Sequence, residues 1–336
     1  MKSSNIGGQA VLEGIMMKNK DRYAVAVRKP DQEIEVDVQE YKSIVPWKAV
    51  SQIPFIRGIF SFVDSLVLGM KTLMYSASFF EDEEVDAKEL TEEEAEKEEK
   101  KERILMNLTV AFSVVLAIGI FMVLPYFLSN LVRSYVASHW GLTIVEGVIR
   151  VGIFLAYIAL ISRMKDIQRT FMYHGAEHKC INCIEHGLEL NVENVRKSSR
   201  QHKRCGTSFL FFVMIVSIIF SFFITAESQV LRVLLRIAML PLIAGVSYEI
   251  IRLAGNSDHC LVNFLSKPGL LIQNMTTKEP DDSMIEVAIR AVEAVFDWRA
   301  YENETFGTQY GEDAEQRKHA EQQENTDAAD PKEDEV

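Results

Sequence analysis

The sequence predicts a mainly α-helical, polytopic membrane protein with four transmembrane helices, a small N-terminal β-hairpin and cytoplasmic helices. Three observations predict this class. Four stretches are apolar and about 20 residues long, which is the length that crosses a bilayer core. The Lys and Arg residues next to these stretches are concentrated on one side of them. Most of the acidic residues lie in two segments outside them, in a chain of 336 residues with a net charge of −12.

The N-terminal region, residues 1–52, is expected to be cytoplasmic and to contain the β-hairpin. Residues 23–27 and 34–38 alternate apolar and polar side chains, and the turn sequence Lys-Pro-Asp lies between them. Alternation with a period of two is typical of a strand with one buried face. These two segments therefore predict the two strands of the hairpin.

A glycine-rich stretch, residues 6–14, precedes the hairpin. Its three glycines predict a tight loop, or a backbone that another part of the chain approaches closely. A second hypothesis is that Gln9 or Glu13, which lie among these glycines, reaches a metal site formed further along the chain. Both interpretations stay open at this stage.

Residues 53–80 are apolar but are interrupted by Arg57, Asp64 and Lys71. This pattern predicts an amphipathic helix at the membrane surface. The alternative is a fifth transmembrane span, which would place the amino terminus outside the cell.

Two acidic segments account for the negative charge of the chain. The predicted linker, residues 81–103, has 13 acids and 5 bases, and residues 302–336 have 12 acids and 3 bases. Their net charges are −8 and −9, so the remainder of the chain is +5. Segments of this composition remain solvated, and residues 301–336 are expected to form a disordered tail. No basic stripe is interleaved with aromatic residues, so nucleic-acid binding is not expected.

The predicted transmembrane domain comprises residues 104–254. Its spans are residues 104–128, 143–162, 207–226 and 230–253. The loop at 163–206 carries nine Lys and Arg residues, whereas the loop after the first span carries only Arg133. The positive-inside rule therefore places the long loop and both termini in the cytoplasm of a multi-pass plasma-membrane protein. Arg232 and Arg236 would lie on the outer side, where their long side chains are expected to extend to the interface.

Residues 255–300 are expected to form a cytoplasmic helical region. Within it, residues 280–297 have the spacing of an amphipathic helix. Ser283 and Glu286 match a capping box at its start. The apolar stripe consists of Ile285, Ile289, Val292 and Phe296.

The long cytoplasmic loop contains H-x-x-E-H, formed by His174, Glu177 and His178. Residues four apart lie on one face of a helix, so both imidazoles can bind one metal ion. Glu177 lies beside His174, where it can act as acid or base on a metal-bound water. The order of these residues is the inverted zincin pattern of some zinc hydrolases. The alternative is that both histidines are hydrogen-bonded residues of a protein core.

A second possible metal site lies in the same loop. Cys180 and Cys183 form C-x-x-C, and His202 and Cys205 form H-x-x-C, which together resemble a structural zinc site. At about 100° per residue, the cysteine pair faces away from the histidine pair on one helix, so the two pairs are not expected to share an ion. The simpler interpretation is that Cys180 and Cys183 are thiols packed in a core.

The histidine pair needs a third metal ligand from another part of the chain. His202 and Cys205 rank first, because both precede the third span at the same membrane face. Glu249 ranks next, because an ionisable residue at the end of a span is costly unless it is paired or functional. Glu13 ranks last.

Several longer segments resemble the domain-of-unknown-function 1385 family, to which the YqhQ-like membrane proteins belong. They are GGQAVLEGIMM, YHGAEHK, HKRCGTSF, SYEIIRLAG and TTKEPDDSMIEVAIRAV, spread over about residues 5–298. The resemblance implies a metal-dependent membrane enzyme. It also implies functional roles for six residues: His174, Glu177, His178, His202, Cys205 and Glu249.

The sequence therefore predicts a metal-dependent hydrolase of the membrane, which uses zinc or another divalent ion to cleave a peptide, ester or amide bond. Glu177 is the expected catalytic residue. The alternative is a non-catalytic membrane scaffold or assembly factor with a structural zinc site. The expected partners are membrane lipid and a membrane protein or a second copy of the chain.

Overall fold

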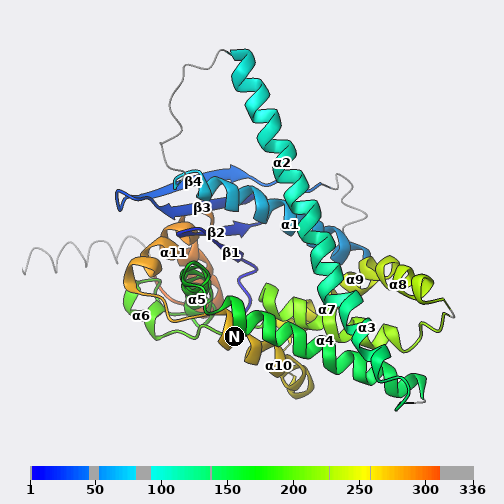
Figure 1. Ribbon diagram of the computed structural model, residues 1–336. Coiled ribbons are helices and arrows are strands. Elements are labelled where there is room, and N and C mark those ends of the chain that lie inside the picture. The colour runs from blue at the N-terminus through cyan, green and yellow to red at the C-terminus, as the bar shows by residue number, and fades with distance from the viewer. Residues whose placement is uncertain are drawn as a thin grey trace, which may run out of the picture.

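The computed structural model describes residues 2–44, 53–80, 92–136, 138–226, 228–257 and 259–310 (Figure 1). It is mainly helical with a small N-terminal antiparallel sheet, as predicted. The strands are β1 (Gly7–Val11), β2 (Gly14–Asn19), β3 (Arg22–Arg28) and β4 (Ile34–Glu40). The helices are α1 (Ile56–Ala77), α2 (Glu92–Ile118), the π-helix η2 (Gly119–Val123), α3 (Leu124–Leu131), α4 (His139–Ile161), α5 (Lys165–Glu185), α6 (Val192–Lys197), α7 (Gly206–Ser221), α8 (Gln229–Ala238), α9 (Leu240–Asn256), α10 (Cys260–Thr276), α11 (Asp282–Val295) and α12 (Trp298–Phe306).

The four strands form an antiparallel meander in the order β1-β2-β3-β4. The predicted hairpin is confirmed as β3 and β4. Of the two interpretations of residues 6–14, the loop was wrong, because this stretch forms β1 and the start of β2, and the closely approached backbone is confirmed at Gly8. Gly8 explains the difference: a Cβ at this position would lie 2.6 Å from the backbone oxygen of Met16 and 3.1 Å from the side chain of Glu177. The glycine therefore allows close approach within a strand.

Helices cover both faces of the sheet (Figure 1). Helices α5 and α11 pack on one face, where Ile15, Met17 and Ala26 enter the main hydrophobic core. The other face carries a smaller apolar cluster that includes Leu68 of α1. The central strands are consequently buried on both sides, which explains why their sequences are apolar almost throughout.

Among the described residues, three helices are long and apolar enough to cross a membrane. They are α1, the continuous helix at residues 104–131, and α4. A fourth candidate is the pair α8 and α9, if these two helices, bent by 43°, form one span. The stretch predicted as the third span forms α7, which has only 16 residues.

Helix α1 connects the sheet with the apolar helices. Near its start, Gly58 lies so close to α9 that a Cβ would be 2.6 Å from Tyr248. Its second half is buried at Leu68, Thr72 and Ser76, on the side that faces the sheet. The second half of α1 is thus packed on the sheet, although the length and composition of the helix would permit it to cross a membrane.

Three charged side chains, Glu146, Arg150 and Arg236, are buried together between helices α4 and α8. Both guanidinium nitrogens of Arg236 donate to Glu146, at 2.6 and 2.9 Å, and Arg150 donates to the same carboxylate at 2.6 Å. All three side chains are at most 6% exposed. The expectation that Arg236 extends to the interface was therefore wrong, because the carboxylate of α4 provides a partner within the helix bundle.

The C-terminal helices differ from the prediction in detail. Helix α11 confirms the amphipathic helix, but its N-cap is Asp281, whose carboxylate accepts from the backbone N–H of Met284 at 3.0 Å. Residues 301–306 belong to α12 rather than to a disordered tail, and Glu302 is fully buried there. The rest of the predicted tail, residues 311–336, and the first part of the predicted linker, residues 81–91, lie outside the described residues.

Candidate functional site

Helix α5 packs against β1, β2, α6 and α11 and positions H-x-x-E-H. It continues through both cysteines to Glu185 and ends at His186, with Gly187 in the left-handed conformation at φ +71°. The rings of His174 and His178 lie 4.4 Å apart between centroids. The predicted one-turn pair on a single helix face is confirmed.

Backbone carbonyls hold both imidazoles in one tautomer. The Nδ1 atom of His174 lies 3.0 Å from the oxygen of Thr276, and Nδ1 of His178 lies 2.7 Å from the oxygen of Arg200. A carbonyl oxygen only accepts hydrogen bonds, so each Nδ1 carries the proton and donates it. Each Nε2 is left to accept a proton or a metal ion. Metal-binding histidines usually have this second-shell partner.

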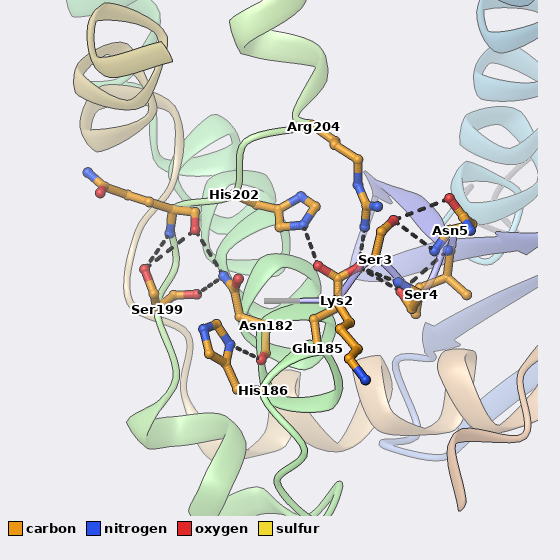
Figure 2. Close-up of polar contacts among 12 residues, drawn as sticks. Lys2, Ser3, Ser4, Asn5, Asn182, Glu185, His186, Ser199, His202 and Arg204 are labelled. Atoms are coloured by element: carbon orange, nitrogen blue, oxygen red, sulfur yellow. Dashed lines mark hydrogen bonds and ion pairs between the residues drawn. The ribbon is translucent and has the colours of Figure 1, made fainter. Parts of the chain in front are cut away.

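Polar side chains of α5 also hold the loop that precedes α7. Lys179 donates to the backbone oxygens of Arg196 and Ser198, both at 2.9 Å. Asn182 donates to the backbone oxygens of Ser199 and Gln201, at 2.7 and 2.9 Å (Figure 2). These contacts fix the path of the chain from α6 to α7 and so bring residues 200–205 over the face of α5 that carries the histidines.

Cys205 joins the two histidines. It caps the N-terminus of α7, and its Sγ lies 3.2 Å from Nε2 of His174. One donor atom from each of His174, His178 and Cys205 lies within 4.8 Å of the others, and no second group of this kind occurs among the residues that the structure describes. Two imidazole nitrogens and a thiolate are ligands that zinc prefers, and three ligands leave a fourth position for water. The residues therefore fit a divalent metal ion.

Cys205 and His174 shift each other's pKa, because their side chains are in contact. Burial would raise the pKa of Cys205, but the imidazoles of His174 and His178 hold it well below its usual range. Burial would lower the pKa of His174, but the neighbouring Cys205 thiolate raises it to about 9. At neutral pH the two groups therefore form a thiolate–imidazolium pair across the 3.2 Å contact of Sγ and Nε2.

Glu177 lies next to the two histidines and is only 5% exposed. Its carboxylate accepts a hydrogen bond from the backbone N–H of Gly8 at 3.1 Å. Burial raises the pKa of Glu177, although His178 and His174 oppose this effect. A carboxyl group with a raised pKa in a buried place is suited to accept and return a proton.

His202 lies close to the site but faces elsewhere. Its ring centroid is 5.7 Å from that of His178, and its Nε2 points to Glu185 at 3.5 Å (Figure 2). Its backbone is held by Gln273, which accepts from its N–H at 2.9 Å. The residue is therefore a neighbour of the cluster and not one of its three donors.

Glu185 is a fully buried carboxylate that the sequence did not indicate. It accepts from the backbone N–H and the hydroxyl of Ser4, at 2.8 and 2.9 Å, and it pairs with Arg204 and His202 (Figure 2). Burial would raise its pKa, but these partners hold it at about 2. Glu185 thus ties the N-terminal segment to the residues that immediately precede Cys205.

Replacing Glu185 by Gln is expected to lower the free energy of unfolding by about 3 kcal/mol at pH 7, because the carboxyl group has a pKa of about 2 in the folded protein and 4.5 in the unfolded chain. A carboxyl group with a depressed pKa stabilises the fold above its unfolded pKa of 4.5, and this contribution disappears as the pH falls towards 2. Thermal unfolding in detergent at pH 7 and at pH 3 measures this. A constant difference between the two proteins at both pH values would contradict the prediction.

Glu249 and Glu13 do not reach the histidine cluster. The carboxylate of Glu249 accepts from Arg57, at 2.7 and 2.5 Å, and from the backbone of Phe55 at 3.1 Å. Glu13 pairs with Arg169. Glu249 is bound by Arg57 of α1, and Glu13 is bound by Arg169 of α5. Each carboxylate therefore has an arginine as its partner instead of the histidine cluster.

Gln9, Cys180 and Cys183 also lie away from the histidine cluster. The side chain of Gln9 lies against Gly69 of α1 rather than at the cluster. Cys180 and Cys183 are free, fully buried thiols in the main core, on the other side of α5 from the histidines. Because Cys205 is beside His174, the four-residue site built on C-x-x-C and H-x-x-C does not form.

Comparisons with known proteins agree with the motifs. The family model described as "Protein of unknown function (DUF1385)" matches residues 53–298. The chain is 37% identical over 291 residues to "Uncharacterized protein YqhQ" of Bacillus subtilis (strain 168), which covers 85% of this chain and 90% of that protein. No solved structure matches the chain. The chain therefore belongs to the DUF1385 family of proteins of unknown function.

Proposed function

We propose that the protein is an integral membrane metal-dependent hydrolase whose metal site lies at the cytoplasmic membrane face. One observation supports the metal site above all: both histidines donate Nδ1–H to a carbonyl, so both Nε2 atoms are available beside the sulfur of Cys205. Zinc is the proposed ion because its preferred ligands are nitrogen and sulfur.

The proposed membrane arrangement has four spans and both termini in the cytoplasm of a plasma-membrane protein. The spans are the helix at residues 104–131, α4, α7 with the residues that follow it, and the bent pair α8 and α9. Helix α1 is not counted, since its second half packs on the sheet. The nine basic residues at 163–206 lie on the same side as the cluster, which supports a cytoplasmic site.

The chemistry assigned to the site is hydrolysis of an ester, amide or peptide bond. A bound metal ion lowers the pKa of a water molecule and stabilises negative charge on the substrate. Glu177 would accept the proton of this water and return it to the leaving group. The N–H of Gly8 would hold the carboxylate of Glu177 in position, and the apolar side chains around α5 would exclude bulk water.

The test is Glu177→Gln in zinc-loaded protein in detergent, assayed on a panel of activated esters, amides and peptides. We expect zinc content to remain at the wild-type level, while hydrolysis falls at least about 100-fold, the usual contribution of a positioned general base. His178→Ala, which loses a ligand, is the control that should lose both zinc and hydrolysis. Equal hydrolysis by wild type, Glu177→Gln and His178→Ala, or none by the wild type, would overturn the hydrolase proposal.

If the protein is instead a scaffold with a structural metal ion, Glu177→Gln should be silent and loss of a ligand should unfold the domain. Measuring zinc content and thermal unfolding of the same variants separates the two functions. The cluster's open fourth position favours the hydrolase, because structural zinc sites are usually closed by four protein ligands.

A further inference from the structure

A cleft of 560 Å³ lies between the sheet, α1 and the end of α9. Residues of β1 and β2 form one wall, Leu68 of α1 and Ile251 of α9 contribute apolar side chains, and Arg204 lies at the side next to α7. In the proposed membrane arrangement, the last turn of α9 and the residues before α7 are at the level of the cytoplasmic lipid headgroups. The cleft is therefore open to the protein–membrane boundary.

The cleft is positively charged. Four of its lining residues are basic: Lys18, Lys20, Arg204 and Arg252. Its one acid is Asp64, whose carboxylate already accepts hydrogen bonds from Tyr41, Ser43 and the backbone of Ile44. The cleft thus has more cations than the single carboxylate can neutralise.

Two of the cations have no carboxylate partner within the described part of the chain. Arg252 and Lys20 are both exposed, and neither side chain forms an ion pair or a hydrogen bond with another described residue. The acid nearest to Arg252 along its helix, Glu249, is bound by Arg57. By contrast, Arg204 is paired with Glu185 and Lys18 lies 3.1 Å above the ring of Tyr41. Arg252 and Lys20 are therefore the cations available to an external anion.

Apolar side chains also line the cleft: Met16 of β2, Leu68 of α1 and Ile251 of α9. A ligand that fits both the cations and these side chains needs a negatively charged head and a hydrocarbon tail. We propose that this cleft binds the phosphate-bearing headgroup of an anionic phospholipid, with Lys20 and Arg252 as its principal cations and the start of its acyl chains against Leu68 and Ile251.

The cleft also adjoins the proposed metal site. Gly8, which donates to Glu177, lines the cleft, and Arg204 immediately precedes Cys205. Lipid binding does not require the metal ion, so this inference stands apart from the proposed hydrolase. Gly8 and Arg204 are therefore next to both sites.

The experiment measures binding of fluorescent phosphatidylglycerol to the full chain in uncharged detergent, with and without a chelator. We expect the variant Lys20→Gln/Arg252→Gln to bind about 25-fold more weakly, since each cation contributes about fivefold. The matched control, Arg290→Gln/Arg299→Gln, removes the same charge from α11 and α12 and should bind like the wild type. Thermal unfolding of both variants checks that neither has lost its fold.

Two further ligands identify the source of the anion. Phosphatidylcholine, which has no net charge, should bind at least about tenfold more weakly than phosphatidylglycerol, and inorganic phosphate should compete only at much higher concentrations. Equal binding of both lipids, or of the cleft and control variants, would overturn the proposal. Inorganic phosphate binding as tightly as the lipid would also overturn it, because the acyl chains would then contribute nothing. Loss of binding with the chelator would show that the metal site, and not the cleft, holds the lipid.

Discussion

Replacing His174, His178 or Cys205 is expected to weaken zinc binding at least about 100-fold. Loss of a second-shell partner alone already costs 10- to 100-fold in metal affinity, and these residues would contact the ion directly. The substitutions are His174→Ala, His178→Ala and Cys205→Ser. Competition with a chromophoric chelator measures the affinity, and cobalt substitution adds a thiolate absorption band that Cys205→Ser should remove.

Matched substitutions outside the cluster make this prediction specific. His202→Ala, Glu249→Gln and Cys183→Ser change residue types that bind zinc, but the structure places them away from the three donor atoms. Their zinc affinity should stay within a few-fold of the wild type. If His202→Ala lost zinc while Cys205→Ser retained it, the assignment of the third ligand would be wrong.

The affinity should also depend on pH. In the metal-free protein the Cys205 thiolate raises the pKa of His174 to about 9, so at pH 7 a proton must leave before zinc can bind. Zinc affinity is therefore expected to increase as the pH rises towards 9, with release of protons that calorimetry in two buffers detects. An affinity independent of pH between 6 and 9 would contradict the thiolate–imidazolium pair.

Glu146→Leu is expected to destabilise the helix bundle by about 3–5 kcal/mol, because it leaves two buried cations without a carboxylate. Arg236 and Arg150 come from α8 and α4, and both are almost completely buried around Glu146. Arg150 also donates to Ser217 of α7 at 2.5 Å, so the cluster joins three helices. Thermal unfolding in detergent measures the loss.

A triple variant separates lost pairing from lost packing. Glu146→Leu/Arg150→Met/Arg236→Leu replaces all three charges by apolar side chains of similar size, which often restores or increases stability. The exposed pair Glu193 and Lys197 is the control, and its removal should have no measurable effect. A single variant Glu146→Leu as stable as the wild type would show that the cations find another partner.

Much of α5 was predictable because its information is local. The one-turn spacing of His174 and His178, the opposite orientation of Cys180 and Cys183, and the stop at Gly187 all follow from helix periodicity and backbone conformation. The apolar helices and the β3–β4 hairpin follow from periodicity in the same way. These features depend on residues close together in the chain.

The choice among distant residues was not predictable in this way. Cys205 and His202 are three residues apart, yet one faces His174 and the other Glu185, because the loop held by Lys179 and Asn182 turns them in different directions. Likewise, no local pattern predicts that Gly8 contacts Glu177 from 169 residues away.

The sequence by itself determined that two imidazoles share one helix face beside a glutamate, and that the chain contains several apolar helices and is mildly basic outside its two acidic segments. Only the tertiary structure decided which third donor joins the imidazoles, which carboxylates bind arginines instead, and where the cations gather into a cleft. The physical reason is that periodicity sets the direction of a side chain on its own helix. Its partners depend on how helices far apart in the chain pack together.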